Sequence, residues 1–357
     1  MLAVSQAAEL GGAEYALLRI ARRLPARGFD VELATPARGG LMDAAAADGI
    51  PVHTLAVGAL RGGAWPRAVV GWPRARRLMR RLEPDLVYLN GAVSQRLAPA
   101  FAGATLVPHL HDLLEVAPRP WRSERFWRSV PIVLCDSDAV GRAAAAAGAP
   151  PERLRTVYCP VDDVERAPRP DWADGQPVVG YVGRIEPRKG TLDLVRAAHR
   201  LAERLPELRL VLVGDDDFAA SREYSARVRE EAAALGDRVV LVGRVDEART
   251  LMPWFDVLCV PSRREPFGTV AAEALSAGTP VVATRSGGMD EYVVPGRNGA
   301  LVAPGEPGEL ADAIASVLES ATAMSAAALE DSGRFASDRV AGLVADALEE
   351  ALAASSG

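Results

Sequence analysis

Short apolar runs rich in β-branched residues alternate with long Ala-, Leu- and Arg-rich segments from one end of this 357-residue chain to the other. The apolar runs are continuous, which favours parallel strands that are covered on both faces. The segments between them repeat apolar residues at helical spacing. This βαβ alternation predicts an α/β protein with two doubly wound, Rossmann-like parallel sheets.

The alternation stops once along the chain. Prolines and charges replace the periodic pattern between about residues 163 and 177, as expected of a linker. We therefore expect an N-terminal Rossmann-like domain over residues 1–165, a linker over 166–177, a second such domain over 178–334 and a C-terminal helix within 335–357. That helix could pack back on the first domain. Twelve strands are expected, at residues 2–5, 31–36, 51–57, 86–90, 104–111, 132–137, 178–183, 208–214, 238–243, 256–262, 280–286 and 300–304.

Composition excludes several classes of partner. The net charge of −6 argues against a general surface for nucleic acid. Three scattered cysteines without a CxxC pair indicate neither a zinc site nor a disulfide framework. We expect a cytoplasmic protein with no metal, no membrane span and no secretory signal. The basic segment at 73–82 permits at most peripheral contact with a membrane. No oligomeric state is predicted.

The stretch VGRIEPRKG, residues 182–190, contains the chain's single lysine, Lys189. It reads as the end of a strand, a loop and the start of a helix, and Arg184 lies in the same loop. A helix N-terminus with two cations beside it suits a diphosphate. A surface loop with two solvated cations is the alternative. The position at a strand's carboxyl end favours the first interpretation, in which Lys189 acts as a compact point charge.

A second pattern, PSRREPFGTVAAEALSAGTPVVAT, places Glu265 and Glu273 eight residues apart. If a helix begins near Gly268 or Thr269, Glu265 lies in the loop before it and Glu273 lies on its first turns. The backbone N–H groups of residues 267–270 can then point at an anion. Glu273 could accept hydrogen bonds from the vicinal hydroxyls of a ribose, and Glu265 could reach a sugar.

Residues 178–318 resemble the C-terminal domain of family 4 glycosyltransferases, which are retaining enzymes of the GT-B fold that use nucleotide-diphosphate sugars. The similarity covers GRIEPRKG, the E-x7-E motif, SGGMDEYV and GRNGALVAPG. It implies that Arg184 and Lys189 bind the donor diphosphate, that Glu265 contacts the donor sugar and that Glu273 binds the ribose. It also implies that the amides of Phe267, Gly268, Thr269 and Val270 hold the distal phosphate and the sugar.

The first domain is similar to the same family more loosely. There, Gly11 and Gly12 match the paired glycines that let the backbone approach the donor phosphate or the acceptor. The segment PHLHDL places His109 and His111 at a strand end. In the family a histidine followed by an acidic residue lies near the reacting centre, and His111 with Asp112 fits better than His109. A structural histidine in the wall of the site is the alternative.

The resemblance implies transfer of a sugar from an NDP-sugar, with UDP or GDP as the nucleotide, to a hydroxyl of a small-molecule or glycolipid acceptor, with retention and without a metal or other cofactor. Arginine-biased composition suggests a bacterial source and an acceptor from specialised metabolism or the cell envelope. A nucleotide-sugar epimerase and a non-catalytic nucleotide-sugar-binding module are the alternatives.

One segment departs from the family's pattern, and another invites a metal site. The segment Cys159-Pro160-Val161-Asp162 stands where many members read Asn-Gly-Val-Asp. Three aspartates, 215–217, invite a metal site, but loop carboxylates alone specify no coordination geometry.

Overall fold

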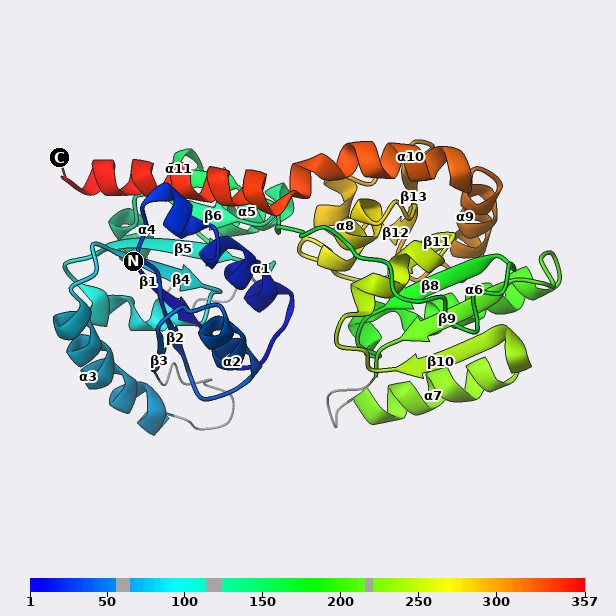
Figure 1. Cartoon of the computed structure of the whole chain (residues 1–357), viewed down its shortest axis with the longest axis horizontal. Coiled ribbons are helices and arrows are strands. Elements are labelled where there is room, and N and C mark those ends of the chain that lie inside the picture. Colours follow the sequence, from blue (N-terminus) through cyan, green and yellow to red (C-terminus); the bar gives the residue numbers. More distant parts are fainter. Residues whose placement is uncertain (56–64, 114–123, 216–220, 357) are drawn as a thin grey trace. The chain divides into compact units, whose positions relative to one another are not determined.

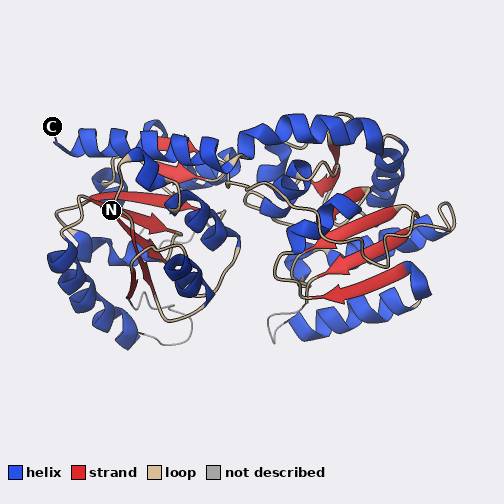
Figure 2. Cartoon of the chain, viewed as in Figure 1, coloured by secondary structure: helices blue, strands red, loops and turns tan. Residues whose placement is uncertain are grey.

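The computed structural model describes residues 1–55, 65–113, 124–215 and 221–356. The chain forms two compact units. Residues 1–162 and 336–357 make up the first unit, and residues 163–335 make up the second. Each unit is built on one parallel sheet with helices packed against it (Figures 1 and 2). The prediction of an α/β protein with two Rossmann-like sheets is confirmed.

The sheet of the first unit has seven strands in the order β3-β2-β1-β4-β5-β6-β7, and every pairing is parallel. Between β1 and β4 the winding changes direction, which in such sheets marks the usual ligand position. Its strands are β1 (Leu2–Ser5), β2 (Glu32–Thr35), β3 (Val52–Thr54), β4 (Leu86–Asn90), β5 (Thr105–Leu110), β6 (Val133–Cys135) and β7 (Leu154–Thr156). The short edge strand β7 was not expected from the sequence.

Side chains of successive strand residues enter two different cores of the first unit. Leu2 and Val4 pack in one apolar cluster and Ala3 packs in the other, because neighbouring side chains of a strand point to opposite faces. Both faces are thus covered, as the continuous apolar runs predicted. The helices are α1 (Gly12–Ala21), α2 (Gly40–Ala47), α3 (Trp65–Leu82), α4 (Glu124–Ser129) and α5 (Asp138–Ala146).

The C-terminal helix α11 (Ser337–Ser356) belongs to the first unit, although it follows the second unit in sequence (Figure 1). Val340, Val344 and Leu348 lie at four-residue spacing and are fully buried in the same cluster as residues of α1. Arg23 and Arg27 form ion pairs with acidic residues of α11. Apolar burial is the larger contribution here, because exposed ion pairs contribute little.

The sheet of the second unit has six parallel strands in the order β10-β9-β8-β11-β12-β13. The winding changes direction between β8 and β11. The strands are β8 (Val178–Val182), β9 (Arg209–Val213), β10 (Val239–Gly243), β11 (Val257–Val260), β12 (Val281–Thr284) and β13 (Gly299–Val302). The helices are α6 (Thr191–Ala202), α7 (Arg222–Ala233), α8 (Thr269–Ser276), α9 (Pro307–Glu319) and α10 (Ala321–Ser332).

The irregular segment at 166–177 packs on this second unit. The Trp172 ring stacks on Phe255 with 5.5 Å between the ring centroids, and the Arg166 guanidinium lies 3.5 Å from the centroid of the Trp254 ring. Phe255 in turn lies against Gly180 of β8, where a Cβ would come within 2.2 Å of the ring. Contacts with aromatic side chains therefore hold a segment that has no strand or helix of its own.

Candidate active site

Three loops of the second unit meet at the carboxyl ends of β8, β11 and β12, which are neighbours in the sheet. The N–H of Arg263 donates to the carbonyl of Arg188, and the Glu265 N–H donates to the carbonyl of Ser286. Gly190, in the loop after β8, lies against Pro261 in the loop after β11. A Cβ at Gly190 would come within 2.0 Å of the Pro261 carbonyl oxygen, so only glycine allows the two loops to approach this closely. The close approach of these loops brings Lys189 beside Glu265.

Lys189 and Glu265 form a partly buried ion pair with 2.7 Å between Nζ and Oε2. The Ser262 hydroxyl donates to the same carboxylate oxygen at 2.8 Å. Burial alone would raise the pKa of Glu265, but the charge of Lys189 and the hydrogen bonds from Lys189 and Ser262 together hold this pKa below its ordinary value. Glu265 is therefore an ionised carboxylate at neutral pH.

Arg184 follows β8 in the same loop as Lys189. Its guanidinium lies 3.2 Å from the carboxylate of Glu186 and its side chain is partly exposed. The Tyr181 hydroxyl donates to the backbone carbonyl of Arg184 at 2.7 Å, which fixes the backbone from which this cation projects. Because its side chain is partly exposed, Arg184 can still attract an incoming anion.

Helix α8 begins directly after Gly268, whose backbone is left-handed (φ 90°). A Cβ at Gly268 would come within 2.6 Å of the Met289 side chain and 2.9 Å of the Tyr292 hydroxyl. That hydroxyl lies 2.8 Å from both the Phe267 and the Gly268 carbonyl oxygens. Thr269 is thus the first residue of the helix, and the amides at this end have no preceding turn to bond to.

Glu273 lies on α8 and is half-buried. Glu265 lies in the loop that precedes the helix, so the two glutamates occupy the two positions that their spacing predicted. The contact with Lys189 holds Glu265, whereas Glu273 is positioned by helix α8. Their proposed roles toward the sugar and the ribose are taken up below.

In the first unit, Gly11 is the extended N-cap of α1, and Gly12 is the first residue of the helix. Asn90, at the end of β4, donates to the carbonyl of Ala13. Gly91 has a left-handed backbone (φ 83°), and a Cβ there would lie within 2.3 Å of the Gln6 side chain. The loops after β1 and β4 are thereby joined at the point where the winding of this sheet changes direction.

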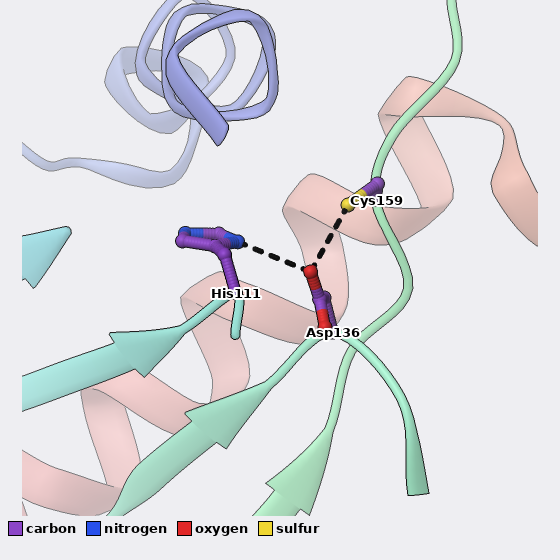
Figure 3. Close-up of side chains that lie close together, drawn as sticks. All are labelled: His111, Asp136 and Cys159. Atoms are coloured by element: carbon purple, nitrogen blue, oxygen red, sulfur yellow. Dashed lines mark hydrogen bonds and ion pairs between the residues drawn. The ribbon is translucent and has the colours of Figure 1, made fainter. Parts of the chain in front are cut away.

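His111 follows β5 and forms a chain of contacts with the loops beside it. Its Nε2 lies 2.8 Å from Asn90 Oδ1 and its Nδ1 lies 3.3 Å from Asp136 Oδ2. Cys159 Sγ lies 3.6 Å from the same carboxylate oxygen (Figure 3). Burial raises the pKa of Asp136, although His111 and Cys159 act in the opposite direction. Burial also raises the pKa of Glu14, although the electrostatic interaction with His111 acts in the opposite direction.

His109 and His111 differ in their surroundings. His109 is fully buried and contacts the Tyr88 hydroxyl, and burial lowers its pKa well below the ordinary value. His111 is the more exposed of the two, at 9%, and it lies beyond the end of its strand. The structure therefore places His109 in the core and His111 at the edge where ligands of such sheets bind.

Several polar residues near His111 were not predicted from the sequence, namely Glu14, Asn90 and Asp136. Asn90 ends β4, Asp136 directly follows β6, and Glu14 lies on α1, the helix that follows β1. Their position at or after the carboxyl end of a parallel strand is the one signal that could have identified them. Asp215, at the end of β9, forms an ion pair with Arg229 at 2.6 Å. The other two aspartates of that run, residues 216 and 217, lie outside the described residues, as does much of the two Trp- and Arg-containing loops near 60 and 115.

Within the described residues, no helix combines the length and the apolar character that a membrane crossing requires.

The segment 159–162, which departs from the pattern of many family members, ends in Asp162. This carboxylate forms ion pairs with Arg19 and Arg23. Burial alone would raise the pKa of Asp162, but the charges of Arg23 and Arg19 help to hold it below its ordinary value.

Both units of the chain match known protein families. The family model described as Glycosyltransferase Family 4 matches residues 10–165, and the model described as Glycosyl transferases group 1 matches residues 164–334. D-inositol 3-phosphate glycosyltransferase 2 of Catenulispora acidiphila is 31% identical, over 95% of this chain and 90% of that protein. The 2-deoxystreptamine glucosyltransferase of Streptomyces kanamyceticus is 40% identical, but only over 41% of this chain and 37% of the relative.

Solved structures give the same result. The crystal structure of Anabaena Alr3699/HepE in complex with UDP-glucose superposes with a TM-score of 0.80 at 29% identity, and the match covers 98% of each chain. Sucrose-phosphate synthase from Thermosynechococcus elongatus shares the fold, with a TM-score of 0.75 at 22% identity. With two parallel Rossmann-like sheets and matches along nearly its whole length, this chain belongs to the family 4 glycosyltransferases and has their GT-B fold.

Proposed function

We propose that this glycosyltransferase moves a sugar from a nucleotide-diphosphate sugar to an acceptor hydroxyl with retention of anomeric configuration and without a metal. The observation that carries the proposal is the Lys189–Glu265 ion pair, which lies where three strand-end loops meet. A buried carboxylate paired with a compact ammonium next to a helix N-terminus offers both a cation for phosphate and an acceptor for sugar hydroxyls.

The chemical difficulty is departure of a diphosphate from the anomeric carbon while positive charge develops on the sugar ring. Arg184, Lys189 and the amides of residues 267–270 supply positive charge and N–H donors for the leaving group. Groups that are already oriented toward developing charge need no reorganisation during the reaction. Glu265 orients the sugar, and Glu273 accepts hydrogen bonds from the ribose hydroxyls.

In the first unit we assign the acceptor side to His111, with Gly11 and Gly12 allowing close approach of the backbone. The Asn90 carbonyl oxygen can only accept, so His111 Nε2 carries a hydrogen in this contact. Asn90 and Asp136 together fix the plane of the imidazole. Such a positioned ring can donate to or accept from a sugar or acceptor hydroxyl.

UDP-glucose is the first donor to test, because HepE was crystallised with it. GDP-sugars remain the alternative donor class. For the acceptor, the names of two relatives suggest inositol 3-phosphate and 2-deoxystreptamine as probes. A family 4 member with three buried cysteines that form no disulfide and a nucleotide-sugar donor suits the cytoplasm, and we propose that compartment.

The experiment incubates the protein with labelled UDP-glucose or GDP-mannose, with and without each acceptor. Release of nucleotide that depends on the acceptor, with a labelled glycoside as product, supports transfer. A rearranged sugar without acceptor would indicate an epimerase, and tight binding without turnover would indicate a binding module.

Variants test the assigned residues. Replacing Arg184 and Lys189 together by alanine should lower kcat by about 100-fold or more, because one such donor typically contributes that much. Lys189→Arg alone should also lower kcat, since a planar guanidinium is a poor substitute for the compact ammonium that pairs with Glu265. Arg204→Ala, which removes an exposed arginine paired with Asp312, is the matched control. Parental turnover by the double variant would contradict the proposal.

A further inference from the structure

Three side chains with metal-ligating atoms meet at the carboxyl edge of the first unit's sheet: His111 after β5, Asp136 after β6 and Cys159 beyond β7 (Figure 3). They come from three separate segments, so the sheet topology alone brings them together. All three are largely buried. Buried imidazole, carboxylate and thiol groups in one place need an explanation beyond packing, because desolvating such groups is costly.

The spacing of their ligand atoms suits a small divalent cation. His111 Nδ1 and Asp136 Oδ2 lie 3.3 Å apart, and Cys159 Sγ lies 3.6 Å from the same oxygen. Tetrahedral zinc, with bonds of about 2.0–2.3 Å, sets its ligand atoms about 3.3–3.7 Å apart. All three atoms lie within 4.8 Å of one another, so the third pair needs to close by about 1 Å at most to reach this spacing.

The surroundings of His111 leave the required nitrogen available. Its Nε2 bonds the Asn90 carbonyl oxygen, an acceptor, so the neutral ring has its lone pair on Nδ1, which faces Asp136. A histidine that ligates a metal usually donates its other N–H to an oxygen in this way. The second carboxylate oxygen of Asp136 is buried and has no hydrogen-bond partner among the described residues, so this carboxylate is incompletely satisfied by the protein.

We propose that His111, Asp136 and Cys159 form a binding site for a thiophilic divalent cation of the zinc class, with the fourth coordination position left for water or a ligand. One thiolate, one imidazole and one carboxylate suit Zn²⁺ or Co²⁺ and disfavour Mg²⁺ and Ca²⁺, which prefer all-oxygen sites. The sequence predicted no metal site, because these ligands are scattered over residues 111–159 without a recognisable spacing.

A cation at this position would restrain transfer rather than assist it. This consequence rests on the proposed function, in which the His111 imidazole serves the acceptor side. The metal would occupy Nδ1, which is the ring nitrogen with a lone pair, so the imidazole could no longer accept a hydrogen from an acceptor hydroxyl, and the protein free of metal is the active form. The Cys159 thiol takes no part in the proposed transfer, which makes it the residue at which zinc binding and catalysis can be separated.

The test titrates metal-free full-length protein with Co²⁺ and follows the charge-transfer absorption of a cobalt–thiolate bond. We expect one Co²⁺ per chain with this band, displacement of Co²⁺ by Zn²⁺ and a higher melting temperature with Zn²⁺. Cys159→Ala should remove the band and weaken binding by at least about 100-fold. Cys259→Ala is the matched control, because this buried cysteine lies on β11 in the other unit, and it should bind as the parent does.

Cys159→Ser keeps the size of the side chain, so it separates loss of the ligand from loss of folding: it should melt near the parental temperature and lack the band. Absence of a thiolate band in the parent, or an unchanged band in Cys159→Ala, would overturn the proposed site. In transfer assays we expect Zn²⁺ to inhibit the parent and to spare Cys159→Ala. Binding without inhibition would leave the site standing and reject His111 as an acceptor-side group, whereas lack of turnover in every protein would reject the proposed function alone.

Discussion

Lys189 Nζ lies 2.7 Å from Glu265 Oε2, and the carboxylate of this pair is more deeply buried than the ammonium. The chain's single lysine and the first glutamate of the E-x7-E pattern are therefore one electrostatic unit. The pair is held by two loops, since the Arg263 N–H donates to the carbonyl of Arg188 next to Lys189. The following predictions test what this pair and its supporting residues contribute.

Removing the Lys189 cation alone should lower the unfolding free energy more than removing both charges of the pair. Lys189→Met leaves a buried carboxylate without its counterion, which typically costs about 3–5 kcal/mol of unfolding free energy. The double variant Lys189→Met/Glu265→Gln removes that uncompensated charge and should recover much of the loss. Urea unfolding of the parent, both single variants and the double variant gives the coupling energy of a double-mutant cycle. Additive effects of the two substitutions would contradict the burial argument.

The pH dependence of stability should have opposite signs at two carboxylates. The pKa of Glu265 is lowered in the folded protein, so its ionisation stabilises the fold above the unfolded pKa of about 4.3 and this contribution is lost as pH falls through the folded value. The advantage of the parent over Glu265→Gln should therefore shrink below about pH 4.3.

Glu14 provides the control of opposite sign, since burial raises its pKa. Its ionisation destabilises the fold above the unfolded pKa, and this penalty disappears as pH falls back through the window between the folded and unfolded values. The unfolding free energy of Glu14→Gln should therefore increase relative to that of the parent as pH rises through that window. Urea unfolding between pH 3 and pH 7 measures both differences, and equal slopes for the two variants would refute the assignment.

Gly190→Ala should be far more damaging than Gly236→Ala. Both glycines have a left-handed backbone, with φ of 69° and 58°, so both substitutions incur about 1–2 kcal/mol of backbone strain. Only at Gly190 would the new Cβ meet the Pro261 carbonyl at 2.0 Å, whereas Gly236 has nothing within 4 Å. We expect Gly190→Ala to separate the two loops, with lower stability and lost turnover. Similar unfolding midpoints for the two variants would be inconsistent with this packing.

Tyr292→Phe should disturb the first turn of α8. The hydroxyl that it removes shares its single hydrogen between the carbonyl oxygens of Phe267 and Gly268. Losing it leaves these buried carbonyl groups less satisfied, at a cost of about 1–3 kcal/mol. Turnover should fall as well if the amides of this turn hold the leaving group. Tyr224→Phe, which removes a hydroxyl that accepts from the Leu192 N–H in a partly buried hydrogen bond, controls for the loss of a tyrosine hydroxyl. The two variants should differ in kcat more than in unfolding free energy.

His111→Gln should lower turnover by about 100-fold, the lower end of the range for a positioned proton donor or acceptor, while donor binding to the second unit persists. Isothermal titration with UDP separates this result from misfolding. His199→Gln is the control, because His199 lies on α6 in the second unit, where its Nε2 is 2.8 Å from the backbone carbonyl oxygen of Glu231. Loss of UDP binding in His111→Gln would show that the histidine acts on the donor.

Strand positions followed directly from the order of the residues. Continuous apolar runs such as VVGYV and LVYLN are long enough for one strand each and too short for a helix, and all twelve expected strands formed. The start of α8 was also predictable, because Gly268 can adopt a left-handed backbone ahead of a run of helix formers. The edge strand β7, only three residues long and half-buried, was missed because its pattern is too short to distinguish from a loop.

Sequence alone determined the two-sheet α/β architecture and the family, and it placed Glu265 in the loop before α8 and Glu273 on that helix, since each of these depends on residues near one another in the chain. Tertiary structure alone decided which partners these residues take. Lys189 meets Glu265 across 76 positions, and Asn90, Asp136 and Cys159 gather at His111 from separate strand ends. Such contacts depend on the order of the strands in the sheet. Local propensity carries no information about which parallel strands lie side by side.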